Sequence, residues 1–156
     1  MREGRIQYLT HHTEDTVWQK RWLNHPNTAD ALVDVVIAVA DVDEAAARFT
    51  RFLGRDTVPT NMGRGIFLDR GGVQLANAKS FAKLLPEVSI PAFPFIGLYA
   101  LRVQSLDTAE RVIGAGRLRY ERRDGVLAVP FPDDLGQGAW LFVERVNDLP
   151  WRRNSR

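Results

Sequence analysis

The stretch VDVVIAVADVDEAAARFTRFLGR, residues 33–55, decides the fold because its pattern occurs again later in the chain. The second copy is GLYALRVQSLDTAERVIGAGR, residues 97–117. Each copy has an apolar run, a short segment containing aspartate, an alanine-containing stretch and a final Gly-Arg. Val39 and Val103, which end the two apolar runs, lie 64 positions apart. A repeat at a fixed offset indicates two similar structural units in tandem.

Each copy begins with a predicted strand and continues as a predicted helix. VDVVIAV is β-branched and almost wholly apolar, which is typical of a buried strand. Asp41 then suits the N-cap of a helix, with Glu44 three residues later as in a capping box, and Gly54 suits its C-terminal end. In the second copy, Ser105 and Gly116 take the corresponding places.

Short strands with tight turns follow each predicted helix. RGIFLD and VQLAN indicate a hairpin in the first copy, and RYERRDGVLAV carries an Asp-Gly turn between two extended runs in the second. GAWLFVER, residues 138–145, is the last predicted strand. The chain is therefore expected to be an α+β protein with two βαβββ units.

The predicted organisation has four further boundaries. Residues 1–31 form an N-terminal arm with a short helix, and the two units span 32–77 and 95–145 within a domain of residues 32–145. The linker 78–94 opens with a short helical piece, AKSFAKLL, and residues 146–156 form a basic tail. We expect its dense basic cluster, WRRNSR, to be solvated rather than to contact nucleic acid, because a net charge of +2 is only a slight basic excess.

Composition excludes several classes of protein. The chain of 156 residues has no cysteine, which excludes disulfides, thiolate metal clusters and a cysteine nucleophile. Its longest apolar run, VVIAVA, is far shorter than the about 20 residues of a membrane span. The opening MREGRIQ has no apolar core of a signal peptide, so a cytoplasmic protein is expected.

The two βαβββ units, the first opening with VVIAVADVDEAAARF, resemble the vicinal oxygen chelate superfamily. That superfamily includes glyoxalase I, ring-cleaving dioxygenases and bleomycin- and fosfomycin-resistance proteins. The longer stretch THHTEDTVWQKRWLNHPNTADALVDVVIAVAD resembles the middle of larger bacterial glyoxalase-like proteins, which implies that this chain corresponds to their C-terminal half. The resemblance also implies a curved, cup-like mixed sheet and a homodimer.

The resemblance implies a place for one divalent metal in the cup. The corresponding first-strand positions are Asp34 and Leu98, and the last-strand positions are Asn77 and Glu144. A leucine cannot bind a metal, an asparagine is a weak neutral ligand, and a catalytic site needs about three protein ligands. The primary expectation is therefore no metal, with Asp34 and Glu144 as the candidate ligands of the alternative.

Two of the three histidines, His11 and His12, stand side by side in IQYLTHHTEDTVW. Neighbouring residues of a strand point to opposite faces, so at most one of the pair can enter a cup. A helix beginning at TEDT, with Thr13 as N-cap, would leave His12 as an ordinary residue before a helix. A structural or exposed role is favoured, and His12 is kept as a candidate ligand-binding residue.

Four other residues are candidates for ligand binding. Arg102 shares a strand face with Leu98, so it can hold an anion in the cup or pair with an acidic neighbour at the rim. Trp140 and Glu144 share parity on the last strand, so they indicate either an apolar wall with one polar group or ordinary core packing. Arg64 lies beside a glycine-flanked bend, where it either binds ligand or is a solvated turn residue.

Three functional hypotheses follow from the sequence. The first is a glyoxalase-like protein that binds a small organic molecule, with anions among the candidates, in the cup without the usual metal. The second is a metal-dependent lyase, isomerase or dioxygenase that uses Asp34, Glu144 and a residue from the arm or a second chain. The third is the non-catalytic half of a larger two-part protein. No catalytic residue, substrate, membrane contact or nucleic-acid partner is assigned.

Overall fold

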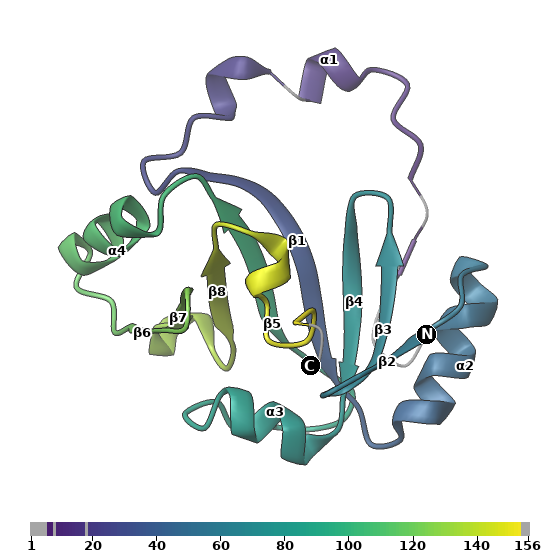
Figure 1. Ribbon diagram of the computed structural model, residues 1–156. Helices are drawn as coiled ribbons and strands as arrows, with labels where there is room; N and C mark the ends of the chain where they lie inside the picture. Colours follow the sequence, from purple (N-terminus) through teal and green to yellow (C-terminus); the bar gives the residue numbers. More distant parts are fainter. Residues whose placement is uncertain (1–5, 8, 18, 154–156) are drawn as a thin grey trace.

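The computed structural model describes residues 6–7, 9–17 and 19–153, so parts of the predicted arm and tail lie outside the described residues. Within them, eight strands form one mixed sheet in the order β2-β3-β4-β1-β5-β8-β7-β6. The curved sheet carries helices on both faces, which confirms the predicted α+β class (Figure 1).

Both predicted βαβββ units are present. The first contains β1 (Ala29–Ala38), α2 (Val42–Leu53), β2 (Val58–Thr60), β3 (Gly63–Leu68) and β4 (Gly71–Ala76). The second contains β5 (Phe95–Val103), α4 (Leu106–Ala115), β6 (Glu121–Arg123), β7 (Val126–Pro130) and β8 (Ala139–Val143). In each unit the first strand runs parallel to the last, and β1 joins β5 antiparallel at the centre of the sheet. The two units therefore have the same topology, as the repeat predicts.

The turn and cap residues act as their types predict. The Asp41 side chain accepts a hydrogen bond from the Glu44 backbone N at 3.0 Å, and Gly54 ends α2 with a left-handed φ of 63°. Ser105 caps α4 in the same way through the Thr108 backbone N. Asp124 and Gly125 turn between β6 and β7 with positive φ angles of 51° and 75°, as in a two-residue hairpin loop.

One face of the sheet, here called the outer face, carries the two long helices. Ala45, Ala46 and Phe49 of α2 pack on the first unit, and Leu106, Ala109 and Ile113 of α4 pack on the second. These residues recur at helical spacing, so each helix buries one apolar stripe. Both long helices lie on the outer face. The opposite face of the sheet, here called the cup face, is therefore covered by other segments.

The cup face is covered by α3 (Ala78–Leu84) and by the C-terminal segment, residues 146–153, which begins with the 3-10 turn η3 (Val146–Asp148). Phe81 and Leu85 are buried there from the linker, and Leu149 and Trp151 from the C-terminal segment. In Figure 1 the yellow C-terminal segment lies across the middle of the sheet. The prediction of a solvated WRRNSR cluster is therefore wrong for Trp151, which together with Leu149 buries apolar surface in the cup.

The N-terminal arm runs as an arc away from the sheet, as Figure 1 shows in purple. It contains α1 (Glu14–Val17), which begins directly after Thr13, and the 3-10 turn η1 (Lys20–Trp22). A further 3-10 turn, η2 (Asp133–Leu135), precedes β8. None of the helices in the described part of the chain has the length and apolar character needed to cross a bilayer.

Candidate functional site

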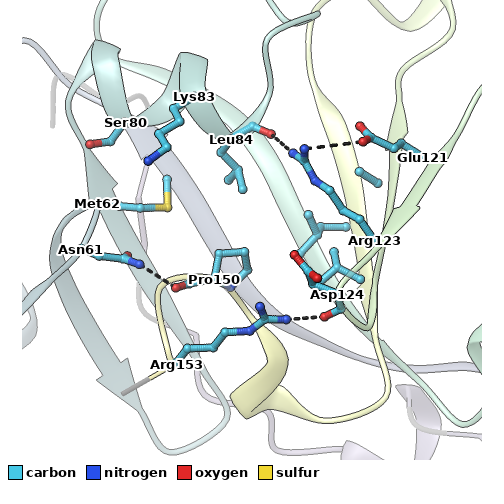
Figure 2. A pocket seen from close by; sticks show the side chains of 13 residues that line it. Asn61, Met62, Ser80, Lys83, Leu84, Glu121, Arg123, Asp124, Pro150 and Arg153 are labelled. Atoms are coloured by element: carbon cyan, nitrogen blue, oxygen red, sulfur yellow. Dashed lines mark hydrogen bonds and ion pairs between the residues drawn. The ribbon is translucent and has the colours of Figure 1, made fainter. Parts of the chain in front are cut away.

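A cavity of about 300 Å³ opens on the cup face between α3, the β6–β7 hairpin and the C-terminal segment (Figure 2). Its floor is apolar and comes from Met62, Leu84, Val126 and Leu141. Met62, Val126 and Leu141 are all at most 5% exposed, so the floor is part of the core. Its polar lining consists of Asn61, Ser80, Lys83, Glu121, Arg123, Asp124 and Arg153.

Helix α3 supplies the polar corner of this cavity. Asn77 caps the helix by accepting a hydrogen bond from the Ser80 backbone N at 2.8 Å, which fixes its first turn. Ser80 and Lys83 are three residues apart, so they share one face of the helix, and Figure 2 shows both beside the cavity. Among the described residues, no hydrogen bond or ion pair engages the Lys83 ammonium.

The opposite side of the cavity carries charges of both signs. Arg123 Nη1 lies 3.5 Å from Glu121 Oε1, so this pair is close to neutral. Arg153 donates from Nε to the Asp148 carbonyl oxygen at 3.1 Å and from Nη2 to the Asp124 carbonyl oxygen. Because carbonyls carry no net charge, the Arg153 charge is not cancelled by these contacts. The lining therefore has three cationic and two acidic side chains.

The C-terminal segment forms one wall of the cavity through Pro150 and Arg153. Asn61 Nδ2 donates to the Pro150 carbonyl oxygen at 2.9 Å, which joins this wall to the β2–β3 turn. Between these two residues, Trp151 and Arg152 reach Asp34 on β1. Asp34 is 1% exposed, and both oxygens of its carboxylate accept hydrogen bonds from these two side chains.

The five residues proposed from the sequence do not line this cavity. Glu144 follows β8, is exposed, and accepts a hydrogen bond from the Leu106 backbone N at 2.8 Å, at the start of α4 on the outer face. Trp140 also lies on the outer face, where its ring packs 4.4 Å from that of Phe131. The placement of Trp140 and Glu144 in the cup is therefore wrong, because β8 turns these positions toward α4.

The remaining three proposed residues are separated from one another. Arg64 pairs with Asp43 of α2 at 3.2 Å on the outer face. His12 is exposed in a bend directly before α1. Arg102 is on the cup face of β5, but it lines a second, more open hollow of about 1200 Å³ beneath the arm. Their roles in ligand binding stay predictions.

Of the two roles expected for Arg102, the structure shows the ion pair with an acidic neighbour. Its Nε donates to Asp30 Oδ1 at 2.8 Å, and the side chain is 45% exposed. This hydrogen bond, with the attraction of the Asp30 charge, raises the pKa of Arg102 above its ordinary value, although loss of solvent opposes the shift. Arg102 therefore stays cationic and belongs to a surface ion pair.

The side chains present do not fit the metal site implied by the resemblance. Asp34 is engaged by Arg152 and Trp151, Leu98 is fully buried in the apolar core, and Asn77 caps α3. Glu144 lies on the other side of the sheet from Asp34. No cluster of three or more carboxylate or histidine side chains suited to an ion occurs in the described part of the chain.

One buried polar side chain on the cup face was missed by the sequence reasoning. Gln74 of β4 is 0% exposed, and its Oε1 accepts a hydrogen bond from Thr60 Oγ1 at 3.1 Å. It stands next to Val36 of β1, one cup-face position along from the pair formed by Asp34 and Gly72. The alternation in GGVQLAN could have indicated it, since Gln74 and Ala76 share parity.

No protein-family model matches this sequence, and no curated protein matches it either. Several solved structures are similar. Methylmalonyl-CoA epimerase from Mycobacterium tuberculosis matches with a TM-score of 0.56 and 24% identity over 79% of this chain and 93% of that chain. A hypothetical protein from Bacillus halodurans matches with a TM-score of 0.55 and 12% identity, over 73% of this chain and 93% of that one.

A xylose isomerase-like TIM barrel/4-hydroxyphenylpyruvate dioxygenase fusion protein also matches. Its TM-score is 0.56 at 19% identity, covering 80% of this chain and 21% of the fusion protein. These identities establish a shared fold rather than a shared activity. The chain therefore shares the fold of these structures, with two βαβββ units joined in one curved mixed sheet.

Proposed function

We propose that this protein binds a small organic acid in the cup-face cavity, without a metal. The observation that carries this proposal is the combination of an apolar floor with the Lys83 ammonium, which no other described residue engages. Small-molecule sites are generally concave and mostly apolar, with a few polar groups that fix orientation. A volume of about 300 Å³ suits a ligand with a short aliphatic or single-ring body.

The charges favour an acidic group at the α3 corner of the cavity. A ligand carboxylate there can accept from the Lys83 ammonium and from the Ser80 hydroxyl. Lys83 is an exposed residue, so water screens this charge-assisted hydrogen bond, and its contribution is about 1 kcal/mol. On the far side, the Arg153 and Asp124 charges offset each other, so a net positive charge remains only at Lys83 and a monocarboxylate is favoured. The apolar body of the ligand would then lie over Met62 and Leu141.

The metal-dependent alternative has no support in the donor set. Its two named ligands, Asp34 and Glu144, lie on opposite faces of the sheet and are both engaged in other contacts. The proposal therefore includes no lyase, isomerase or dioxygenase step.

The experiment is isothermal titration calorimetry on protein treated with EDTA. Hexanoate and benzoate are the probes, and hexanamide and benzamide are their neutral counterparts. We expect the acids to bind about fivefold more tightly than the amides, the effect of about 1 kcal/mol from one screened charge-assisted hydrogen bond. Equal binding of acids and amides, or binding that appears only with added Mn²⁺ or Zn²⁺, contradicts the proposal.

A matched pair of variants tests the place of binding. Lys83→Met removes the ammonium in the cavity, whereas Lys79→Met removes the same charge from the same helix outside it. Only Lys83→Met should weaken hexanoate binding, by about fivefold. Equal losses in both variants would mean that the acid responds to general surface charge.

We also propose that the protein is a cytoplasmic homodimer in which the predicted arm, residues 1–31, packs against a second copy. In support, the arm exposes Leu9, Val17, Trp22 and Leu23, each at 50% or more. Apolar side chains gathered in this way usually mark a contact surface. Light scattering of the full chain should give twice the monomer mass, and Trp22→Ser with Leu23→Ser should reduce it. A monomeric wild-type protein contradicts this part of the proposal.

A further inference from the structure

Asp34 is the one carboxylate among the buried side chains of the described residues, and it lies on a central strand of the sheet. Its Oδ2 accepts hydrogen bonds from Trp151 Nε1 at 2.6 Å and from Arg152 Nε at 2.8 Å, and its Oδ1 accepts from Arg152 Nη2 at 2.5 Å. All three donors belong to the C-terminal segment. A carboxylate is costly to bury unless it is paired and hydrogen-bonded, so this position depends on that segment.

The position of the C-terminal segment depends in turn on Asp34. Arg152 and Trp151 lie between Pro150 and Arg153, the two residues of the segment that line the cup-face cavity. Adjacent residues cannot move independently, so the hydrogen bonds at Asp34 fix where the cavity wall stands. Two other hydrogen bonds join the wall to neighbouring segments. The exposed Asn61 donates one to the Pro150 carbonyl oxygen, and the Asp124 carbonyl oxygen accepts the other from Arg153.

Asp34 itself does not line the cavity. We infer that Asp34 is a positioning residue for the cup-face cavity: through Arg152 and Trp151 it holds the C-terminal segment where that segment forms the wall. The inference rests on the proposed function only where it concerns ligand binding in the cavity. The position of the wall can be tested without any ligand.

The test uses a single cysteine in the cavity. Because the chain has no cysteine, Ser80→Cys introduces the only thiol, and Ser80 is a half-buried residue of the cavity lining. The thiolate attacks the disulfide of 5,5′-dithiobis(2-nitrobenzoate), forms a mixed disulfide and releases one thionitrobenzoate, whose absorbance gives the rate. Combining Ser80→Cys with Asp34→Asn, or with Arg152→Gln, should raise this rate by about tenfold, because local opening exposes the thiol.

Two controls separate positioning from general destabilisation. Phe49→Leu weakens the core under α2 on the outer face, far from the wall, and should leave the labelling rate unchanged. Asp34→Asn together with Arg152→Gln should raise the rate no further than either change alone, because both changes break the same pair of hydrogen bonds. An equal acceleration by Phe49→Leu, or no acceleration by Asp34→Asn, overturns the inference.

Hexanoate added to the same single-cysteine protein distinguishes this inference from the proposed function. Slower labelling with hexanoate, combined with an effect of Asp34→Asn, supports both. If hexanoate has no effect but Asp34→Asn accelerates labelling, the positioning role stands, and calorimetry on the wild-type protein decides the proposed function, because Ser80→Cys removes a hydroxyl assigned to the ligand carboxylate. If hexanoate protects the thiol but Asp34→Asn has no effect, the positioning role fails alone.

Discussion

The Arg152 guanidinium holds the Asp34 carboxylate through two parallel hydrogen bonds, of 2.8 Å from Nε and 2.5 Å from Nη2. The two residues are 118 positions apart in sequence, so this pair closes the C-terminal segment onto a central strand. Arg152 also lies over the Phe67 ring, with its Cζ atom 4.2 Å from the ring centre. The position where the superfamily resemblance implies a metal ligand is thus engaged by the chain's own cation.

Arg152→Met should destabilise the protein strongly. It leaves Asp34 buried at 1% exposure without a counter-charge, and breaking a buried pair in this way costs about 3–5 kcal/mol. Urea unfolding followed by fluorescence measures the change. Arg102→Met is the matched control, because it breaks an exposed pair with Asp30 and should cost less than about 1 kcal/mol. Similar losses in both variants would contradict the importance of the buried pair.

Gly72→Ala should destabilise the same pair from the other side. A Cβ at Gly72 would lie 2.6 Å from Asp34 Oδ1 and 2.9 Å from Arg152 Nη2, closer than real contacts allow. Thermal unfolding should show a loss of about 1–3 kcal/mol from overpacking. Gly114→Ala is the control, since its nearest neighbour would be Tyr120 at 3.6 Å and alanine favours a helix. A neutral Gly72→Ala would show that the carboxylate can move aside at no cost.

Trp151→Phe tests the third hydrogen bond at Asp34. Phenylalanine keeps most of the buried apolar surface but removes the indole N–H that donates to Oδ2 at 2.6 Å. We expect a loss of about 1–3 kcal/mol in the free energy of unfolding, the usual effect of removing one partner of a buried charged group. Phe142→Leu on the outer face should leave the labelling rate of a cysteine at Ser80 unchanged, whereas Trp151→Phe should raise it.

Glu144→Ala should affect stability without affecting acid binding. The Glu144 carboxylate accepts from the Leu106 backbone N at the positive end of the α4 dipole, so its removal should cost about 0.5–1 kcal/mol. Hexanoate affinity measured by calorimetry should match that of the wild type, in contrast to Lys83→Met. A loss of hexanoate affinity in Glu144→Ala would contradict binding on the cup face, because Glu144 lies on the outer face.

Local patterns in the sequence predict the fold well. The repeat at 64 positions, the cap at Asp41 and the Asp-Gly turn at Asp124 all act over a few residues, and the structure confirms the elements that they predict. Short-range hydrogen bonding and strand alternation determine caps, turns and strands. The same local pattern at two places in the sequence therefore predicts the same elements twice.

The site was harder to predict because it depends on contacts between distant segments. The sequence indicated a helix in AKSFAKLL, but not that it would cover the cup face with Lys83 beside a cavity. WRRNSR has the composition of a solvated tail, and nothing local shows that Trp151 and Arg152 reach Asp34. Glu144 was misplaced because it shares strand parity with Phe142, which packs on the outer face, whereas Leu141 and Val143 face the cup.

The central claim is that the cup-face cavity, without a metal, is the site where a small organic acid binds. The most direct test is a ¹H–¹⁵N correlation titration of EDTA-treated protein with hexanoate. We predict that the shifted amides cluster at Met62, Ser80 to Leu84, Glu121 to Val126 and Trp151 to Arg153. Shifts gathered around Asp30 and Arg102 in the second hollow, or shifts that require an added divalent metal, would contradict the account.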